Sequence, residues 1–251
     1  MNNPDTNNPD NLALDVSAVT VAYGRKAVLQ DFSLAVARGE TFGLMGLNGA
    51  GKTTLIKAIL GLRNIKQGRI AIGGRDSTDA ESRRMLAYLP ERFDPPSFLC
   101  GLEFIRFSLS LYNTPFDANA ARAFAESLAL DPDVLKNRVQ TYSKGMRQKL
   151  GLMATLMTNC PLLILDEPMS GLDPLARAYL KDVLRAARGE GRTIFLSSHV
   201  LSDMNEICDR VSVLHQGKLE FVGTPAGLRQ QTGNDNIERA FLAMIGAKVA
   251  A

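Results

Sequence analysis

Short apolar runs alternate with polar, glycine-containing segments along this chain, and in its first third they predict strands. Branched and aromatic residues concentrate in runs over residues 16–21, 28–36, 42–45 and 70–72. Gly24, Gly39 and the pair Gly73-Gly74 separate these runs, as turn residues do between strands. A further short apolar run over residues 85–89 ends at Pro90. We therefore expect the opening third of the chain to be rich in β structure.

The pattern then changes to a helical spacing. Residues 92–158 form a block of expected helices, over residues 102–112, 118–130 and 143–157. After this block, two strand-like runs at residues 162–165 and 193–196 flank a helical stretch over residues 174–189. A hairpin over residues 211–222, turning at Gln216-Gly217, precedes a closing helix near residues 237–245. Alternating strands and helices indicate an α/β fold with a mainly parallel sheet, into which the helical block is inserted.

Composition narrows the class of protein. The 251 residues are 45% hydrophobic, enough to bury one substantial core. No apolar run approaches the roughly 18 residues that cross a bilayer, and no basic-then-apolar leader opens the chain. Three cysteines with no paired spacing fit reduced thiols of the cytosol, and a net charge of +3 is too weak to indicate a nucleic-acid partner. We expect residues 1–11 to be a disordered tail and residues 12–246 to be one domain.

The strongest chemical signal follows the strand predicted at residues 41–45. Residues 46–53 fit the pattern G-x-x-x-x-G-K-[ST], in which glycines let successive backbone N–H groups face phosphate oxygens. Lys52 would add a charge for the β- and γ-phosphates, Thr53 would hold Mg²⁺, and the helix beginning near Lys52 would direct its positive end at the same anion. The residues expected to hold the nucleotide here are Gly46, Asn48, Gly49, Ala50, Gly51, Lys52, Thr53 and Thr54.

Candidate catalytic groups follow three other strands. Glu91 comes after the run at residues 85–89, Asp166 and Glu167 after the run at 162–165, and His199 after the run at 193–196. Because the carboxyl ends of parallel strands share one edge of the sheet, we expect these groups to meet the phosphate loop there. Asp166 would be a hard oxygen ligand for Mg²⁺, Glu167 would polarise the attacking water, and His199 would contact the γ-phosphate or orient that water. Taken singly, an acidic pair after a strand is more often a solvated turn or a helix cap, and a histidine is more often structural.

Two further features have alternative interpretations. Tyr23, at the end of a strand, is either a packed aromatic side chain or a surface on which a base stacks. Residues 142–149 begin a helix for which Ser143 suits the N-cap, yet Lys144, Arg147 and Lys149 crowd its positive end. This is either a solvated basic face or a place where an anion docks. Since it is not the phosphate-loop helix, such an anion would be a nucleotide held by another copy.

Together these residues resemble the ATP-binding subunit of ABC transporters from about residue 12 to residue 246. Residues 46–54 are similar to the Walker A loop, residues 162–167 to Walker B with the catalytic glutamate, residues 143–146 to the signature motif and residues 170–173 to the D-loop. Tyr23 stands at the position of the adenine-stacking aromatic, Glu91 at that of the Q-loop glutamine and His199 at that of the switch histidine. Seven motifs occur in the order of the family.

The resemblance implies a P-loop NTPase core with an N-terminal antiparallel β-subdomain and an inserted helical subdomain over about residues 92–158. It implies a homodimer, or a heterodimer with a related subunit, that holds ATP and Mg²⁺ between one copy's Walker A loop and Ser143, Gly145 and Asp173 of the other. It further implies a transmembrane partner, at the cytoplasmic face of the cell membrane. This chain has Ser-Lys-Gly-Met at the signature motif and Glu91 at the Q-loop position, where other residues are more usual. In both features it is similar to the branch of bacterial exporters for drugs and polysaccharides. We also expect Glu91 to bind Mg²⁺, directly or through water, the alternative being that it faces solvent and matters only to the turn. We expect apolar residues within 93–112 to dock the membrane subunit.

Rival interpretations come from other classes. A non-transport ABC-type ATPase acting on a macromolecular complex would normally carry two motif sets or a long coiled-coil insertion. A P-loop kinase or GTPase would lack the signature helix, and a scaffolding protein would not need both Glu167 and His199. The cargo and the identity of the membrane partner are not readable from these residues.

Overall fold

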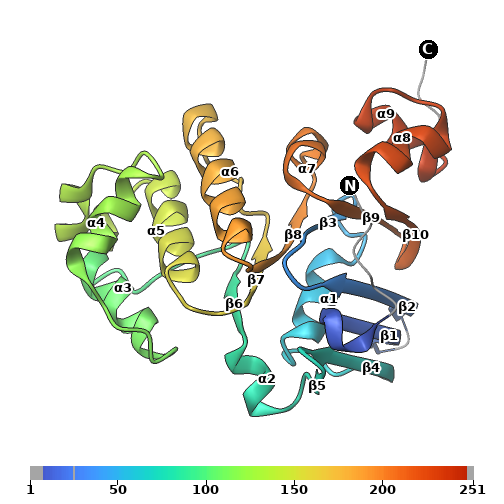
Figure 1. Ribbon diagram of the computed structural model, residues 1–251, viewed down its shortest axis with the longest axis horizontal. Helices are drawn as coiled ribbons and strands as arrows, with labels where there is room; N and C mark the ends of the chain where they lie inside the picture. Colours follow the sequence, from blue (N-terminus) through green and yellow to red (C-terminus); the bar gives the residue numbers. More distant parts are fainter. Residues whose placement is uncertain (1–7, 25, 248–251) are drawn as a thin grey trace.

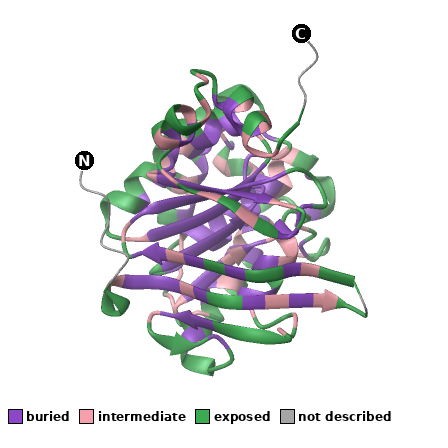
Figure 2. Cartoon of the chain, turned by 90° about the vertical axis from the view of Figure 1, so that its right-hand side faces the viewer, coloured by how far each residue is buried: buried purple, intermediate pink, exposed green. Residues whose placement is uncertain are grey.

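The computed structural model describes residues 8–24 and 26–247, and they form two sheets flanked by helices (Figure 1). The smaller sheet has the antiparallel order β2-β1-β4-β5. Its strands are β1 (Leu12–Tyr23), β2 (Lys26–Ala37), β4 (Gln67–Ile72) and β5 (Arg75–Asp76). Along β1 and β2 buried and less buried residues largely alternate, as Figure 2 shows in colour, because one face of the sheet covers the core.

The larger sheet has the order β10-β9-β3-β8-β7-β6. Its strands are β3 (Thr41–Met45), β6 (Leu86–Leu89), β7 (Leu162–Asp166), β8 (Thr193–Ser198), β9 (Arg210–His215) and β10 (Lys218–Gly223). The five strands from β9 to β6 are parallel, and β10 pairs with β9 as an antiparallel hairpin. The prediction of parallel strands is therefore confirmed for the four strands whose ends carry the candidate groups.

Successive residues of the central strands face two different cores. Along β7, Leu162 and Ile164 belong to the core beneath the antiparallel sheet, whereas Leu163 and Leu165 belong to the core on the opposite side. β8 repeats this division, with Phe195 facing the first core and Leu196 the second. Both faces of these strands are covered, which explains their continuous apolar runs.

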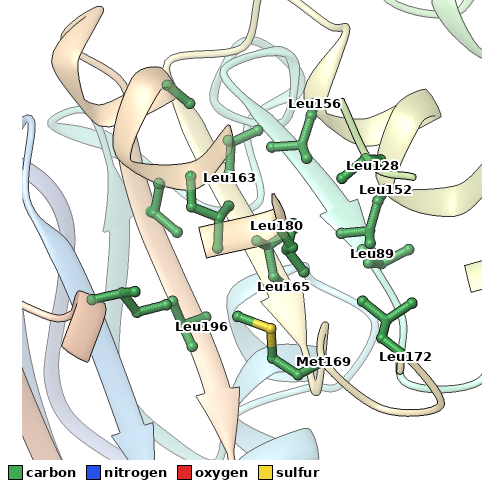
Figure 3. Packing of buried hydrophobic residues seen from close by; sticks show 14 of the residues in the cluster. Leu89, Leu128, Leu152, Leu156, Leu163, Leu165, Met169, Leu172, Leu180 and Leu196 are labelled. Atoms are coloured by element: carbon green, nitrogen blue, oxygen red, sulfur yellow. The ribbon is translucent and has the colours of Figure 1, made fainter. Parts of the chain in front are cut away.

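Helices cover the second core. α5 (Lys144–Leu156) and α6 (Pro174–Gly189) contribute leucines to this core, including Leu152, Leu156 and Leu180 (Figure 3). α3 (Gly101–Ser110) and α4 (Ala118–Glu126) lie beyond α5, on the side away from the antiparallel sheet (Figure 1). The inserted helical subdomain predicted from the sequence is thus present.

The remaining elements are short. The other helices are α1 (Lys52–Ile59), α2 (Ala80–Arg84), α7 (Leu201–Ile207), α8 (Pro225–Thr232) and α9 (Ile237–Met244), with 3₁₀ turns at Pro9–Asn11, Pro132–Lys136 and Val139–Thr141. α2, α7, α8 and the 3₁₀ turns were not predicted. In the part of the chain that is described, no helix combines the length and hydropathy needed to cross a membrane.

Two expectations about boundaries differ from the structure. The helix expected over residues 118–130 ends at Glu126, because Ala129 adopts a positive φ of 52° that reverses the chain and returns Leu130 to the core. Of the tail expected over residues 1–11, residues 1–7 lie outside the described residues, and Pro9–Asn11 forms a 3₁₀ turn in which the Asn8 side chain accepts a hydrogen bond from the Asp10 N–H.

Candidate active site

A glycine-rich loop joins β3 to α1 at the carboxyl edge of the parallel sheet. Gly49 and Gly51 have φ of 81° and 117°, values that side-chain-bearing residues rarely adopt. Gly51 is the N-cap of α1, and no side chain caps the helix there. The first N–H groups of α1 therefore have no side-chain acceptor, which suits the binding of an anion.

Lys52 lies across the mouth of this loop. Its ammonium donates a hydrogen bond to the carbonyl oxygen of Gly46 at 2.8 Å and lies 3.6 Å from Oε1 of Glu167. The residue is only 7% exposed. The positive charge is thus fixed between the loop and the end of β7, where an anionic group on the loop would meet it.

Asp166, the last residue of β7, lies on the other side of the loop. Its carboxylate accepts hydrogen bonds from the hydroxyl of Ser197 and, at 3.2 Å, from the hydroxyl of Thr53. Burial raises the pKa of Asp166, and the nearby carboxylates of Glu91 and Glu167 raise this pKa further. A divalent cation beside Thr53 and Asp166 would offset this unfavourable concentration of charge. The two side-chain oxygens and their electrostatics therefore fit Mg²⁺.

Glu167 is held in a defined orientation at the same edge. Its backbone has a positive φ of 52°, and its N–H donates to the carbonyl oxygen of Ser197 at 3.2 Å. Its Oε2 accepts from Nδ1 of His199 at 2.8 Å and from the His199 backbone N–H at 3.3 Å. Glu167 is buried, whereas the side chain of His199 is 54% exposed. Because a carboxylate only accepts, Nδ1 of His199 is the donor in this hydrogen bond.

These groups line one cavity of about 330 Å³. Its walls are formed by Val28, Leu47, Asn48, Gly49, Gly51, Lys52, Thr53, Thr54, Glu91, Asp166, Glu167 and His199. The four strand ends singled out in the sequence thus contribute to a single site. Gly46 and Ala50 do not line the cavity directly, although the carbonyl oxygen of Gly46 holds Lys52.

Besides Gly46 and Ala50, four further expected nucleotide contacts are not part of this wall: Tyr23, Ser143, Gly145 and Asp173. Tyr23 is 46% exposed, and the guanidinium of Arg63 lies 3.8 Å from its ring centroid. Ser143 caps α5 by accepting from the Met146 N–H at 3.2 Å. Asp173 caps α6 by accepting from the Ala176 N–H at 2.9 Å, and this hydrogen bond lowers the pKa of Asp173.

The interpretation of Lys149 as part of a basic, anion-facing helix end is wrong. Lys149 is buried, and its ammonium donates to the carbonyl oxygen of Ala129 at 2.7 Å. It supports the turn that ends α4. Ser143 and Lys144 remain exposed at the start of α5, so a smaller part of the expected basic surface is accessible.

Sequence reasoning missed two functional neighbours. Ser197 binds Asp166 through its hydroxyl, and it directly precedes the Ser198-His199 pair that ends the predicted strand. Ser197 lies at the end of a parallel strand and pairs with Asp166 in the sheet register, and this position could have indicated a contact between the two side chains. Val28 reaches the cavity from β2, and nothing in the local sequence distinguishes it from the other apolar residues of that strand.

Comparison with known proteins gives a consistent result. The sequence profile of the family described as "ABC transporter" matches residues 29–170. The chain is 38% identical over 210 residues to an ABC transporter ATP-binding protein of Synechocystis sp., covering 82% of this chain but only 58% of that relative. It is 35% identical over 245 residues to a daunorubicin resistance ATP-binding protein of Streptomyces coeruleorubidus, covering 95% of this chain and 77% of that protein. A solved structure of an ATP-binding subunit of an ABC transporter superposes with a TM-score of 0.86 at 32% identity, covering 92% of this chain and 99% of that one.

Proposed function

The chain belongs to the ABC transporter family, and we propose that it binds and hydrolyses ATP to drive a separate transmembrane subunit. The observation that carries this proposal is the cavity in which the phosphate loop, Lys52, Asp166, Glu167 and His199 meet. Phosphoryl transfer to water needs three kinds of group, and the cavity has each of them. They are a cation, a buried carboxylate beside a hydroxyl, and a second carboxylate oriented by a histidine.

Binding is assigned to the loop and its lysine. The N–H groups of Gly49 and Gly51 and the start of α1 would hold phosphate oxygens, and Lys52 would neutralise charge on the β- and γ-phosphates. Thr53 and Asp166 would hold Mg²⁺, which when bound neutralises charge that develops on the phosphates. Among the described residues no group of three or more His, Cys, Asp or Glu side chains could hold a metal by itself.

Hydrolysis is assigned to Glu167. Its buried carboxylate would accept a proton from the attacking water, and the 2.8 Å hydrogen bond from His199 fixes its direction. The half-exposed ring of His199 would then face the γ-phosphate from the open side of the cavity. Each of these roles belongs to a side chain that ends a strand of the parallel sheet.

The second half of each nucleotide site would come from another copy or a related subunit. Ser143 and Lys144 are exposed at the start of α5, and Asp173 is exposed at the start of α6. These residues are absent from the wall of the chain's own cavity. A head-to-tail dimer would bring Ser143, Gly145 and Asp173 of one copy over the nucleotide held by the other, with Tyr23 beside the base.

We propose export as the direction of transport and a peripheral position at the cytoplasmic face of the membrane. The similarity to a daunorubicin resistance protein and the Ser-Lys-Gly-Met signature support export of a drug-like or polysaccharide cargo. The transmembrane subunit would dock on the helical subdomain.

An exposed apolar patch supports that docking. Phe98, Phe107 and Leu111 are 71%, 52% and 67% exposed, respectively. Leu99 lies within the segment 93–112 that was expected to dock, but it is partly buried against the core and its carbonyl oxygen accepts from the Val139 N–H, so it does not belong with these exposed residues. Exposed apolar side chains on one subdomain support the proposal that a partner binds there.

The test of the proposed function is a pair of charge substitutions in this patch. Phe98→Asp with Phe107→Asp should release the chain from membranes that contain its partner, because an apolar interface would then bury two charges. Magnesium-dependent ATP hydrolysis by the purified variant should stay within about twofold of the unaltered chain, since neither Phe98 nor Phe107 lines the cavity. Membrane sedimentation and phosphate release measure the two effects.

Leu62→Asp is the matched control, because Leu62 is 69% exposed but lies at the end of α1 rather than on the helical subdomain. It should leave both membrane association and hydrolysis unchanged. Continued association of the double variant would place the docking surface elsewhere. Lack of hydrolysis by the unaltered chain would overturn the proposed function itself.

Glu91 offers a further test of the metal site. Its carboxylate lines the cavity and contributes to the raised pKa of Asp166. Glu91→Gln removes one negative charge, so ATP without Mg²⁺ should bind more tightly and the ratio between Mg-ATP and ATP affinities should narrow. Because the pKa of Asp166 falls towards its usual value, the low-pH loss of Mg²⁺-dependent binding should also move to lower pH. Titrations of both forms across pH 4–7 measure these changes, and an unchanged ratio would remove Glu91 from the metal site.

A further inference from the structure

The turn between β9 and β10 lies against the back of the phosphate loop. The N–H of Gly217 donates a hydrogen bond to the carbonyl oxygen of Ala50 at 3.2 Å. The carbonyl oxygen of Gly217 accepts from the N–H of Gln30, in β2, at 3.1 Å. A single residue thus joins the phosphate loop to a strand of the other sheet.

The space around Gly217 admits no side chain. Its φ is 79°, and a Cβ there would lie 2.1 Å from the carbonyl oxygen of Val28 and 2.9 Å from the carbonyl carbon. These are backbone atoms of β2, so they cannot move aside as the end of a flexible side chain would. Val28 itself lines the cavity. Any substitution at Gly217 must therefore displace either β2 or the turn itself, which carries the hydrogen bond to the phosphate loop.

The loop is closely packed along the rest of this wall. A Cβ on Gly46 would lie 2.8 Å from the carbonyl oxygen of Leu214, in β9. A Cβ on Gly51 would lie 3.1 Å from a methyl carbon of Leu29, in β2. Leu29 and Leu214 are fully buried. The wall behind the loop is therefore made by β2, β9 and the turn at Gly217.

The hydrogen bond to Ala50 has a specific consequence for Gly51. The carbonyl of Ala50 and the N–H of Gly51 belong to one peptide unit, which is planar and trans, so the two groups point in opposite directions. Because the carbonyl is held towards Gly217, at the back of the loop, the Gly51 N–H is directed to the opposite side. Gly51 lines the cavity on that side.

We propose that Gly217 is a positioning residue for nucleotide binding. It fixes the Ala50–Gly51 peptide so that the Gly51 N–H is already aligned for a phosphate oxygen. This inference rests on the proposed ATP binding. Pre-alignment of a donor to an ionised acceptor matters because a hydrogen bond to a charged group contributes more than one between neutral groups.

Gly217→Ala tests the proposal, with Gly74→Ala as its control. Gly74 has a φ of 85°, close to that of Gly217, but a Cβ there would meet nothing within 4 Å. Both variants carry the same strain of a left-handed alanine, and only Gly217→Ala adds the clash with Val28. We expect Gly217→Ala to raise the Kd and KM for Mg-ATP by about 10- to 100-fold, the effect of one lost charge-assisted hydrogen bond, with a smaller change in kcat. Gly74→Ala should leave Kd and KM unchanged.

The Kd of each variant is measured by calorimetric titration at a temperature at which thermal unfolding curves show that both are folded. A difference in Kd then reports on binding and not on unfolding. An unchanged Kd in Gly217→Ala would overturn the inference. If Gly217→Ala does not fold, amide hydrogen exchange in the unaltered chain tests the inference instead. Because coupling between two sites is reciprocal, Mg-ATP should slow exchange of the Gly217 N–H, and no change there would overturn the inference. Absence of Mg-ATP binding by the unaltered chain and by Gly74→Ala would overturn the proposed function as well.

Discussion

Glu167→Gln is expected to stop ATP hydrolysis while leaving ATP bound. The amide has the shape of the carboxylate, and its oxygen can still accept the hydrogen bond from Nδ1 of His199, which is 2.8 Å long in the structure. What is lost is the group that accepts a proton from water. General-base catalysis contributes typically about 10²- to 10⁴-fold, so hydrolysis should fall by at least about 10²-fold. Phosphate release measures turnover, and ATP retained after gel filtration measures binding.

The same variant should accumulate an ATP-bound dimer, because bound ligand stabilises the state that holds it and hydrolysis no longer removes it. Glu126→Gln is the matched control, since Glu126 is an exposed glutamate at the end of α4. It should hydrolyse ATP at the rate of the unaltered chain. Undiminished hydrolysis in Glu167→Gln would remove Glu167 from its assigned role.

The carboxyl edge of the parallel sheet was predictable from the sequence for a physical reason. Strands buried on both faces, such as β7 and β8, must be continuously apolar, so the first ionisable residue after each run marks the end of that run at the sheet edge. This places Asp166 and His199 at one edge, and the structure agrees. The N-cap at Ser143 was predictable in the same local way.

Other features depend on contacts between distant parts of the chain. Lys149 has the charge of a solvated residue, yet it is buried because the carbonyl oxygen of Ala129, in the turn after α4, accepts a hydrogen bond from its ammonium. Gly217 was recognised only as a turn residue, since its contacts with Ala50 and Val28 join segments about 170–190 positions apart in the chain. α7 was not predicted because its seven residues make about two turns, too few for a helical period to show in the sequence.

Mixing two damaged chains should restore hydrolysis if each nucleotide site is shared between copies. Lys52→Ala damages the phosphate loop, and Gly145→Asp adds a charged side chain at the start of α5, which does not line the chain's own cavity. Each variant alone should form dimers with no intact site. A mixed dimer pairs the intact loop of the Gly145→Asp chain with the intact α5 of the Lys52→Ala chain, so one of its two sites is whole. With independent sites and random pairing, an equal mixture should recover about a quarter of the hydrolysis of the unaltered dimer.

The doubly substituted chain, mixed equally with the unaltered one, separates this arrangement from a site built within one copy. If sites are shared, every mixed dimer has one damaged half in each site, and only the dimers of unaltered chains hydrolyse ATP, giving about a quarter of full activity. If each site is built within one copy, the unaltered chain stays active in mixed dimers as well, giving about half. Because a Cβ on Gly145 would lie 3.2 Å from the carbonyl oxygen of Gly171, thermal unfolding must first show that Gly145→Asp is folded. With that established, recovery in the first mixture and a quarter in the second together require a nucleotide bound between two copies.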